Sequence, residues 1–291
     1  AMADFLRQTA KSNGIPLTHA ALVLPSTEVF TRELVMPAMT EQQLLYNLPY
    51  EFRDYLTEEK NKYFFDYSMR EVLRDESGQP TEMNLLACAT LKSTVESYRT
   101  MLRRAGFRLR VLTPSECAYS AVLQAYYRRT QQEGRDLCVV NLGHSATFLY
   151  IYRGGHFASR REIEVGMSDL EHLVADQCSV DVHVAHEYVR QNYNHVLESE
   201  QARELYGRIA VEVVKAVNFF NYNNRERELT QLCLCGGGSA IQPLYDTIAD
   251  TTGMTLHTSA ELLGQRMSTE EPWMYLRAIG GVDLGIKGGL R

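Results

Sequence analysis

The sequence lacks the features that mark several classes of protein. No stretch approaches the roughly 18 consecutive apolar residues of a membrane-spanning helix. The formal net charge of −6 gives no electrostatic reason to expect nucleic-acid binding. There is no internal repeat and no low-complexity tract. What is left is a globular protein with ordinary fractions of apolar (45%) and charged (23%) residues, long enough for one large domain or two smaller ones.

Cysteine and metal-ligand patterns are also missing. The six cysteines have neither the spacing of a disulfide framework nor the paired spacing of a zinc site. Cys233 and Cys235 alternate within an apolar stretch, so we interpret the cysteines as reduced core thiols, consistent with the cytoplasm. His183, His186 and His195 lack an acidic partner and the rigid spacing of a metal site. The sequence therefore predicts no metal site and no nucleophile–base pair.

Two glycine-containing stretches stand out. Asp136–Arg160 predicts a buried strand, a polar turn at Asn141–Ser145 and two further strands up to Val165. Gln231–Ile241 predicts an apolar strand that enters Gly236–Gly238 and then a helix. A tight turn with exposed N–H groups and a glycine loop before a helix are both arrangements that can hold an anion.

Each of these candidates has a structural alternative. The turn at residues 141–145 also fits an ordinary hairpin, and Gly236–Gly238 also fits close packing of a helix on a strand. Glu212 and Lys215 lie one turn apart on a long predicted helix, Glu200–Asn223, where they either contact a ribose or base or form a solvated ion pair. The residues alone do not decide between these alternatives.

The segment 29–112 predicts a small α+β module, in the order strand, helix, strand, strand, helix, strand. Its first helix, which Thr40 and Gln43 cap, carries Leu44, Leu48, Phe52 and Tyr55 at helical spacing. A module this small has little surface to spare, which favours a groove in front of part of this stripe. The alternative is that all four side chains pack in the module's own core.

Local signals predict further boundaries. Thr113–Glu116 and the pair Ser168 and Glu171 both resemble helix N-terminal capping boxes. Gln131–Gly134 is the best candidate for a linker. A last helix is predicted to begin near Pro272, and Gly281–Lys287 is interpreted as part of a C-terminal tail.

In order along the chain, several motifs resemble those of the PilM-type type IV pilus assembly proteins, which have an actin-like ATPase fold and are related to FtsA. The resemblance covers nearly the whole sequence. The motifs that carry it are Phe30–Pro37, Ala105–Phe107, Thr113–Ala118, Asp136–Thr147, Arg161–Gly166, Glu212–Lys215 with Phe219, Leu234–Ser239 and Arg277–Gly280.

The resemblance implies an α/β, actin-like (ribonuclease H-like) two-lobed fold with an inserted α+β subdomain. It also implies that the first strands of the N-terminal lobe, with their phosphate loop, are missing before Ala1. The implied subdomains are a 1A-like remnant at residues 1–27 and 113–131, a 1C-like insertion at 28–112, a 2A-like lobe at 132–178 and 231–291, and a helical 2B-like part at 179–230.

The resemblance implies a degenerate nucleotide site, with ATP or ADP and Mg²⁺ in the full-length protein and none in this fragment. The residues that match are Asn141, Gly143, His144, Ser145, Thr147, Glu212, Lys215, Gly236, Gly237, Gly238 and Ser239. Asn141 stands where ATP-binding relatives have an aspartate, and an amide lacks the negative charge that Mg²⁺ favours. ATP hydrolysis is therefore not expected.

The implied function is that of a cytoplasmic adaptor, peripheral to the cytoplasmic membrane, in type IV pilus or related secretion machinery. Its implied partners are the N-terminal tail of a PilN-like inner-membrane protein and other pilus assembly proteins, not nucleic acid. We expect Leu44, Leu48 and Phe52 to help to bind that tail. The alternatives are an active ATPase of the same superfamily and an FtsA-like polymerising membrane tether.

Overall fold

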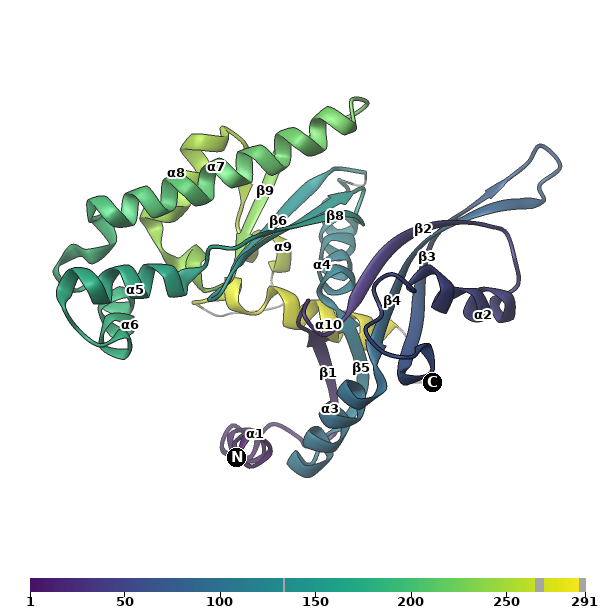
Figure 1. Ribbon diagram of the computed structural model, residues 1–291, viewed down its shortest axis with the longest axis horizontal. Coiled ribbons are helices and arrows are strands. Elements are labelled where there is room, and N and C mark those ends of the chain that lie inside the picture. The colour runs from purple at the N-terminus through teal and green to yellow at the C-terminus, as the bar shows by residue number, and fades with distance from the viewer. Residues whose placement is uncertain (133, 265–269, 288–291) are drawn as a thin grey trace. The chain divides into compact units, whose positions relative to one another are not determined.

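A computed structural model describes residues 1–132, 134–264 and 270–287 (Figure 1). Contacts within the chain divide it into two compact units. Unit 1 contains residues 1–121 and the chain from Arg277 onward, and unit 2 contains Val122–Leu276. The division falls inside helix α4 (Ser115–Thr130). Within the described ranges, no helix has the length and apolar content needed to cross a membrane.

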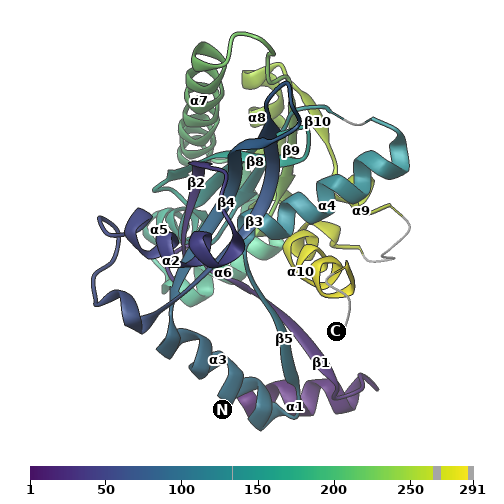
Figure 2. The same ribbon diagram turned by 90° about the vertical axis from the view of Figure 1, so that its right-hand side faces the viewer.

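Unit 1 has a parallel pair of strands, β1 (His19–Leu24) and β5 (Arg108–Pro114). Helix α1 (Met2–Ser12) packs against helix α3 (Lys92–Ala105), as Figure 2 shows. Helix α10 (Leu276–Lys287) belongs almost entirely to this unit. It approaches α4 closely, because a Cβ on Gly280 would lie 2.0 Å from the Ala118 carbonyl oxygen.

The inserted module, which in the structure comprises residues 28–91, contains an antiparallel sheet with the strand order β2-β4-β3. The last strand predicted for it, β5, pairs instead with β1. Its strands are β2 (Phe30–Pro37), β3 (Tyr63–Arg74) and β4 (Pro80–Leu91), with helix α2 (Glu41–Glu51) and a short 3-10 helix (Lys60–Lys62) between β2 and β3. Alternate strand residues face α2 and form a core with it, including Leu34, Met36, Met83, Leu85 and Ala87. The module therefore has its own hydrophobic core.

Unit 2 is built on a five-stranded sheet with the order β10-β9-β6-β7-β8. Its strands are β6 (Leu137–Leu142), β7 (Thr147–Arg153), β8 (His156–Ile163), β9 (Gln231–Cys235) and β10 (Thr255–His257). The strands β6, β9 and β10 are parallel, whereas β7 and β8 return antiparallel. Every residue of β6 except Asn141 is buried, which requires cover on both faces of the sheet.

Helices provide that cover. Cys138, Val140 and Leu142 on one face join a core with α5 (Met167–Cys178), α7 (Glu200–Asn223) and α8 (Gln242–Thr252). On the other side α4 and α9 (Ser259–Leu263) contribute, since the Ser259 hydroxyl donates to the Leu234 carbonyl at 3.0 Å. Helix α6 (Val182–Gln191) and the 3-10 segment Tyr193–Glu198 pack against α5 and α7. Two more short 3-10 helices, Gly237–Ala240 and Pro272–Met274, follow β9 and precede α10.

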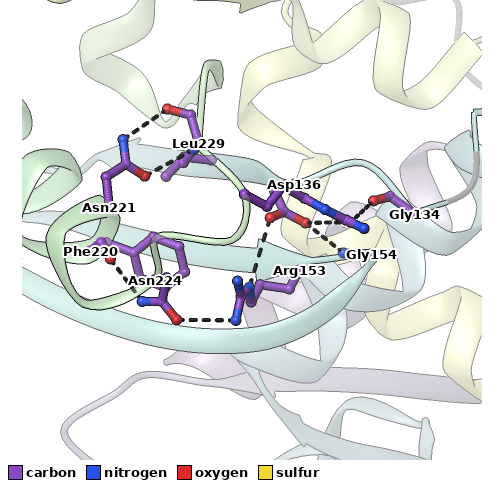
Figure 3. A network of polar contacts seen from close by, with 9 residues as sticks. Gly134, Asp136, Arg153, Gly154, Phe220, Asn221, Asn224 and Leu229 are labelled. Atoms are coloured by element: carbon purple, nitrogen blue, oxygen red, sulfur yellow. Dashed lines mark hydrogen bonds and ion pairs between the residues drawn. The ribbon is translucent and has the colours of Figure 1, made fainter.

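A polar network connects the start of β6 with neighbouring segments (Figure 3). The Asp136 carboxylate accepts from the Gly154 N–H at 3.1 Å and lies 3.8 Å from Nε of Arg153 and 3.5 Å from Nη1 of Arg227. Arg153 also donates to Asn224 Oδ1 at 3.1 Å. The network thus joins β6, the β7–β8 turn and the chain after α7.

The observed elements follow the sequence pattern closely, with three differences. Thr113 and Pro114 end strand β5, so α4 begins at Ser115 and not after a Thr113 cap. Helix α5 is capped by Gly166 and Asp169, not by Ser168 and Glu171. Gly281–Lys287 is part of helix α10 and not a tail.

The contact division also groups the chain differently from the predicted subdomains. Residues 122–131 belong to unit 2, and the chain from Arg277 belongs to unit 1. Of the predicted linker 131–134, residue 133 lies outside the described residues. The finer subdomain boundaries remain predictions.

Candidate functional site

The turn between β6 and β7, residues 143–146, closes on its own backbone. The Gly143 N–H donates to the carbonyls of Asn141 at 3.0 Å and Ala146 at 3.1 Å. A side chain at position 143 would place Cβ 2.6 Å from the Ala146 carbonyl oxygen. The glycine is therefore required by the tightness of the turn itself.

The same turn caps helix α5. The carbonyls of Gly143 and His144 accept from the N–H groups of Met167 at 3.0 Å and Ser168 at 2.7 Å. The first N–H groups of a helix have no partner within it, so these bonds satisfy two of them. These two N–H groups therefore bond to the protein's own turn. Ser168 lies inside the helix, whose N-cap residue is Gly166. The buried Thr147 hydroxyl adds a bond to the Val165 carbonyl at 2.9 Å.

Close packing explains two of the three consecutive glycines. Gly236 has a φ of +83°, and a Cβ there would lie 2.4 Å from Asn141 Oδ1. At Gly238 a Cβ would lie 2.7 Å from Met167 Sδ. Gly237 has nothing within 4 Å of such an atom. The structural alternative thus accounts for Gly236 and Gly238, and only Gly237 has free space for a ligand.

Together these contacts join β6, the turn, the glycine loop and the start of α5 into one hub, residues 141–147, 166–168 and 236–239. Ser239 contributes a bond from its hydroxyl to the Gly236 carbonyl at 2.7 Å. The Gly236 N–H donates to the Trp273 carbonyl at 3.1 Å. The turn and the glycine loop, which the sequence analysis assigned to one site, meet where Gly236 lies against Asn141. Gly166 was not among the predicted site residues, yet a Cβ there would lie 2.3 Å from the His144 carbonyl oxygen.

The structure places Glu212 and Lys215 in a groove that is separate from the hub. They form an ion pair of 2.7 Å on α7, and this hydrogen bond lowers the pKa of the Glu212 carboxyl. Both line a groove of about 610 Å³ with Glu162–Val165 at the end of β8 and with Gly207, Arg208 and Val211. The residues Gly236–Ser239 are not among those that line it. The predicted nucleotide residues therefore fall into two groups.

The hub fits a Mg²⁺–nucleotide poorly. Asn141 is an amide, and residues 141–147 contain no carboxylate. The buried Glu171 carboxylate is nearby, but its Oε1 lies 2.8 Å from His186 Nδ1 and 3.7 Å from His144 Nδ1. Over the described ranges, no three His, Cys, Asp or Glu residues are grouped so that they could hold a metal ion. A hard divalent cation favours several carboxylate oxygens, which this hub does not offer.

The contact between His186 and Glu171 corrects a prediction. The sequence suggested that His186 has no acidic partner, yet Glu171 of α5 supplies one from fifteen residues away. His183 lies at the start of α6, where its N–H donates to the Asp181 carboxylate at 2.8 Å. Nothing local in the sequence signals the His186–Glu171 pair, because α5 and α6 meet only in the folded chain.

The three side chains expected to bind a peptide are in the module's interior. Leu44, Leu48 and Phe52 are 1%, 0% and 0% exposed and belong to the core beneath the sheet. Tyr55, the fourth residue of that stripe, is 47% exposed, and Arg32 lies 5.0 Å over its ring. The module's core therefore takes up Leu44, Leu48 and Phe52, which leaves them no surface for a peptide.

The opposite face of the module's sheet is only partly covered. The first turn of α4 lies at one part of it, where Thr31 donates to Glu116 at 2.9 Å. Beyond this contact, Arg70 forms an ion pair with Glu33 at 2.6 Å, and Val35 is 66% exposed. Burial raises the pKa of the Glu33 carboxyl, although Arg70 acts against this.

Two polar atoms on this face have no hydrogen-bond partner among the described residues. They are Oδ1 of Asn84 and Nη2 of Arg70, and both are buried. Asn84 lies directly opposite Val35 in the pairing of β2 with β4. A buried polar group without a partner is costly, so these atoms identify this face as a candidate binding surface.

Comparison with solved structures shows the fold. The chain matches a structure of the PilM-PilN type IV pilus biogenesis complex at 18% identity with a TM-score of 0.78, over 99% of this chain and 84% of that one. The ethanolamine utilization protein EutJ from Carboxydothermus hydrogenoformans matches at 14% identity and a TM-score of 0.48, over 67% of this chain and 62% of that one. An archaeal actin homologue in complex with ADP matches at 14% identity and a TM-score of 0.46, over 62% of this chain and 59% of that one.

The match to the PilM-PilN complex confirms the predicted α/β fold of the PilM type. No curated protein matches the chain. The sequence model of the family described as type IV pilus assembly protein PilM matches residues 1–271. The chain therefore belongs to the type IV pilus assembly protein PilM family.

Proposed function

We propose that this protein is a cytoplasmic adaptor of type IV pilus or related secretion machinery, and that it binds the N-terminal tail of a PilN-like inner-membrane protein. The observation that carries this proposal is the family match over residues 1–271. The likeness in fold to the PilM-PilN complex, over 99% of this chain, supports it.

We assign the tail to the partly covered face of the module's sheet, next to the first turn of α4. The edge strand β2 offers unpaired backbone groups to an extended peptide, which is a common way to bind one. Val35 supplies an exposed apolar contact on this strand. Asn84 and Arg70 lie on the same face, and Oδ1 of Asn84 and Nη2 of Arg70 have no hydrogen-bond partner among the described residues.

The test is a titration of a synthetic PilN-type tail peptide against the wild type and two variants of this face, Val35→Asp and Asn84→Ala. We expect Val35→Asp to weaken binding by about tenfold or more, as truncation of a buried interface anchor does. The matched control is Leu45→Asp, because Leu45 is 43% exposed on α2, which covers the other face.

Two outcomes separate the parts of this proposal. If both face variants bind as tightly as the wild type, the assigned surface is wrong although the adaptor role stands. If the folded wild type, with any preceding strands of its lobe restored, binds no tail peptide, the adaptor role itself is refuted. Leu48→Ala is a useful third variant, because it should lower stability by about 2–5 kcal/mol but leave the affinity of the folded fraction unchanged.

We also propose that ATP turnover is not part of this function. Phosphoryl transfer needs the metal and the phosphates held from several sides. The hub offers Asn141 in place of a carboxylate, and the N–H groups of Gly143 and Gly236 already donate to the protein's own carbonyls. Weak adenosine binding beside Gly237 is compatible with the free space there. Metal-dependent ATP hydrolysis above background that disappears in Gly237→Trp would refute this proposal and favour the ATPase alternative.

A further inference from the structure

Positive charge is concentrated in one short stretch of this acidic protein. Residues 92–110 contain six basic side chains (Lys92, Arg99, Arg103, Arg104, Arg108 and Arg110) and one acidic side chain, Glu96. The stretch thus has a formal charge of +5 within a chain of −6, which leaves −11 for all other residues. Such an asymmetry indicates a surface that attracts anions.

The periodicity of the helix and that of the strand place four of these arginines at one groove. Arg99 and Arg103 are four residues apart, on one face of α3, and Arg108 and Arg110 are two residues apart, on one face of β5. All four line a single groove of about 620 Å³, together with Phe107 and Leu109. Figure 2 shows α3 and β5 as neighbours in unit 1. We call these four residues the arginine patch.

The patch has few charge partners. Arg99 pairs with Glu96 at 3.0 Å, and no other ion pair of these four arginines is found in the described part of the chain. All four are exposed. Favourable placement near a helix C-terminus explains Arg103 and Arg104, but it does not explain Arg108 and Arg110 on a strand.

We propose that the arginine patch binds the anionic phospholipid headgroups of a membrane surface. Guanidinium groups match phosphate oxygens in charge and geometry. A cluster of four to eight basic residues on an amphipathic helix or beside a membrane is typical of binding to anionic lipids. Apolar side chains in the groove, Phe107 and Leu109, suit the boundary between headgroups and acyl chains better than a free phosphate ion.

The choice of a membrane as the source of phosphate rests on the proposed function. A protein that holds the cytoplasmic tail of an inner-membrane protein is kept close to a surface with negative potential. A second, weak contact with that surface would fix the orientation of unit 1. Because the tail and the lipid engage different faces of unit 1, the two contacts would reinforce each other by effective concentration.

The test is co-sedimentation with vesicles in the absence of any tail peptide. Vesicles of phosphatidylcholine with 30% phosphatidylglycerol should bind the wild type at low salt, whereas pure phosphatidylcholine vesicles should not. We expect the double variant Arg103→Gln and Arg108→Gln to lower the partition coefficient about 25-fold, since each basic residue near such a surface contributes about fivefold. The matched control, Arg203→Gln with Arg225→Gln, removes the same charge from α7 and the loop after it and should bind like the wild type.

Further conditions of the same experiment identify the chemical class of the ligand. Raising NaCl to 1 M shortens the Debye length to about 3 Å and should abolish binding. Sodium phosphate at equal ionic strength should compete no better than NaCl, and stronger competition would point to a soluble phosphate ligand instead. Equal binding by the patch variant and the control would overturn the proposal. So would the absence of vesicle binding, or patch-dependent binding to a DNA duplex only. A tail peptide that binds while vesicles do not would leave the adaptor role intact.

Discussion

The sheet of the inserted module and the five-stranded sheet of unit 2 bury their strands in different ways. Along β3, partly buried and exposed residues largely alternate, because α2 covers only one face of the module's sheet. Along β6, five of the six residues are buried, because helices cover both faces. The central strands of unit 2 contribute to a hub whose residues bond to one another, whereas part of one face of the module's sheet is exposed.

This difference separates structural from binding roles. In unit 2 the residues that looked like a ligand cradle satisfy each other, through the turn carbonyls and the N-terminus of α5. In the module, the face of the sheet opposite α2 holds the buried atoms without partners among the described residues, Asn84 Oδ1 and Arg70 Nη2. We therefore base the proposed binding surface on exposure and on polar atoms without partners, and not on glycine content.

The largest expected effect comes from placing the same charge in the two sheets. Val140→Asp puts a carboxylate into the core of unit 2, where Val140 is 0% exposed. An unpaired buried charge belongs to the class of changes that cost more than about 4 kcal/mol, so we expect no folded unit 2. Val35→Asp on the open face of the module should cost less than about 1 kcal/mol. Denaturant unfolding followed by circular dichroism measures both.

The comparison would fail if the two variants had similar midpoints of unfolding. Similar losses would mean that the outer face of β2 is covered, and the tail-binding surface would then have to be placed elsewhere. The tail-peptide titration on Val35→Asp is interpretable only if this first result holds.

A smaller loss is expected from Asp136→Asn at the start of β6. The carboxylate is 2% exposed, whereas its partners Arg153 and Arg227 are 37% and 59% exposed. Losing a buried partner of an ion pair costs about 3–5 kcal/mol when both are buried, and solvent at the arginines reduces this to about 2–3 kcal/mol. Chemical denaturation gives the value, and Glu96→Gln, from an exposed pair, should change stability far less.

The two adjacent glycines of the hub provide a sharper pair of variants. Gly236→Ala forces a non-glycine residue to a φ of +83° and brings Cβ against Asn141, so we expect a loss of about 2 kcal/mol. Gly237→Ala meets nothing within 4 Å and should be neutral or stabilise slightly. Thermal unfolding of the two proteins distinguishes packing from ligand binding as the reason for these glycines. Equal stabilities would contradict the packing explanation.

The last prediction concerns the pH dependence of stability, and it tests how far α4 covers the sheet of the module. Burial raises the pKa of Cys88 on β4 to about 12 and that of Cys117 in the first turn of α4 to about 11. The thiols of the unfolded chain ionise near pH 9, so the unfolding free energy should fall between about pH 9 and pH 11 to 12. At pH 10 the loss should be about 1.4 kcal/mol for each thiol.

The measurement compares unfolding at pH 8 and pH 10 for the wild type and for Cys88→Ala with Cys117→Ala. The variant should lose less stability than the wild type as the pH rises. An equal pH dependence in both proteins would show that the two thiols are not shielded, and hence that this half of the sheet face is open.

Much of the fold follows from local pattern. The apolar run 137–140, the alternation in the module's strands and the stripe along Glu200–Asn223 each predicted an element that the structure contains at nearly the same residues. The periods of helix and strand reflect burial directly, so elements of this kind are readable from one sequence. The same pattern also left Leu44, Leu48 and Phe52 as either core or groove, and only the packed module assigned them to its core.

The sequence by itself determined the order of the elements, the module and the arginine-rich stretch 92–110, because these depend on residues that are near one another along the chain. Only the tertiary structure decided that Gly236 approaches Asn141, that His186 meets Glu171, and that Glu212 faces the end of β8. Each of these joins residues on different elements. Such pairs depend on how whole helices and sheets pack, and a local pattern shows which face is buried but not what covers it.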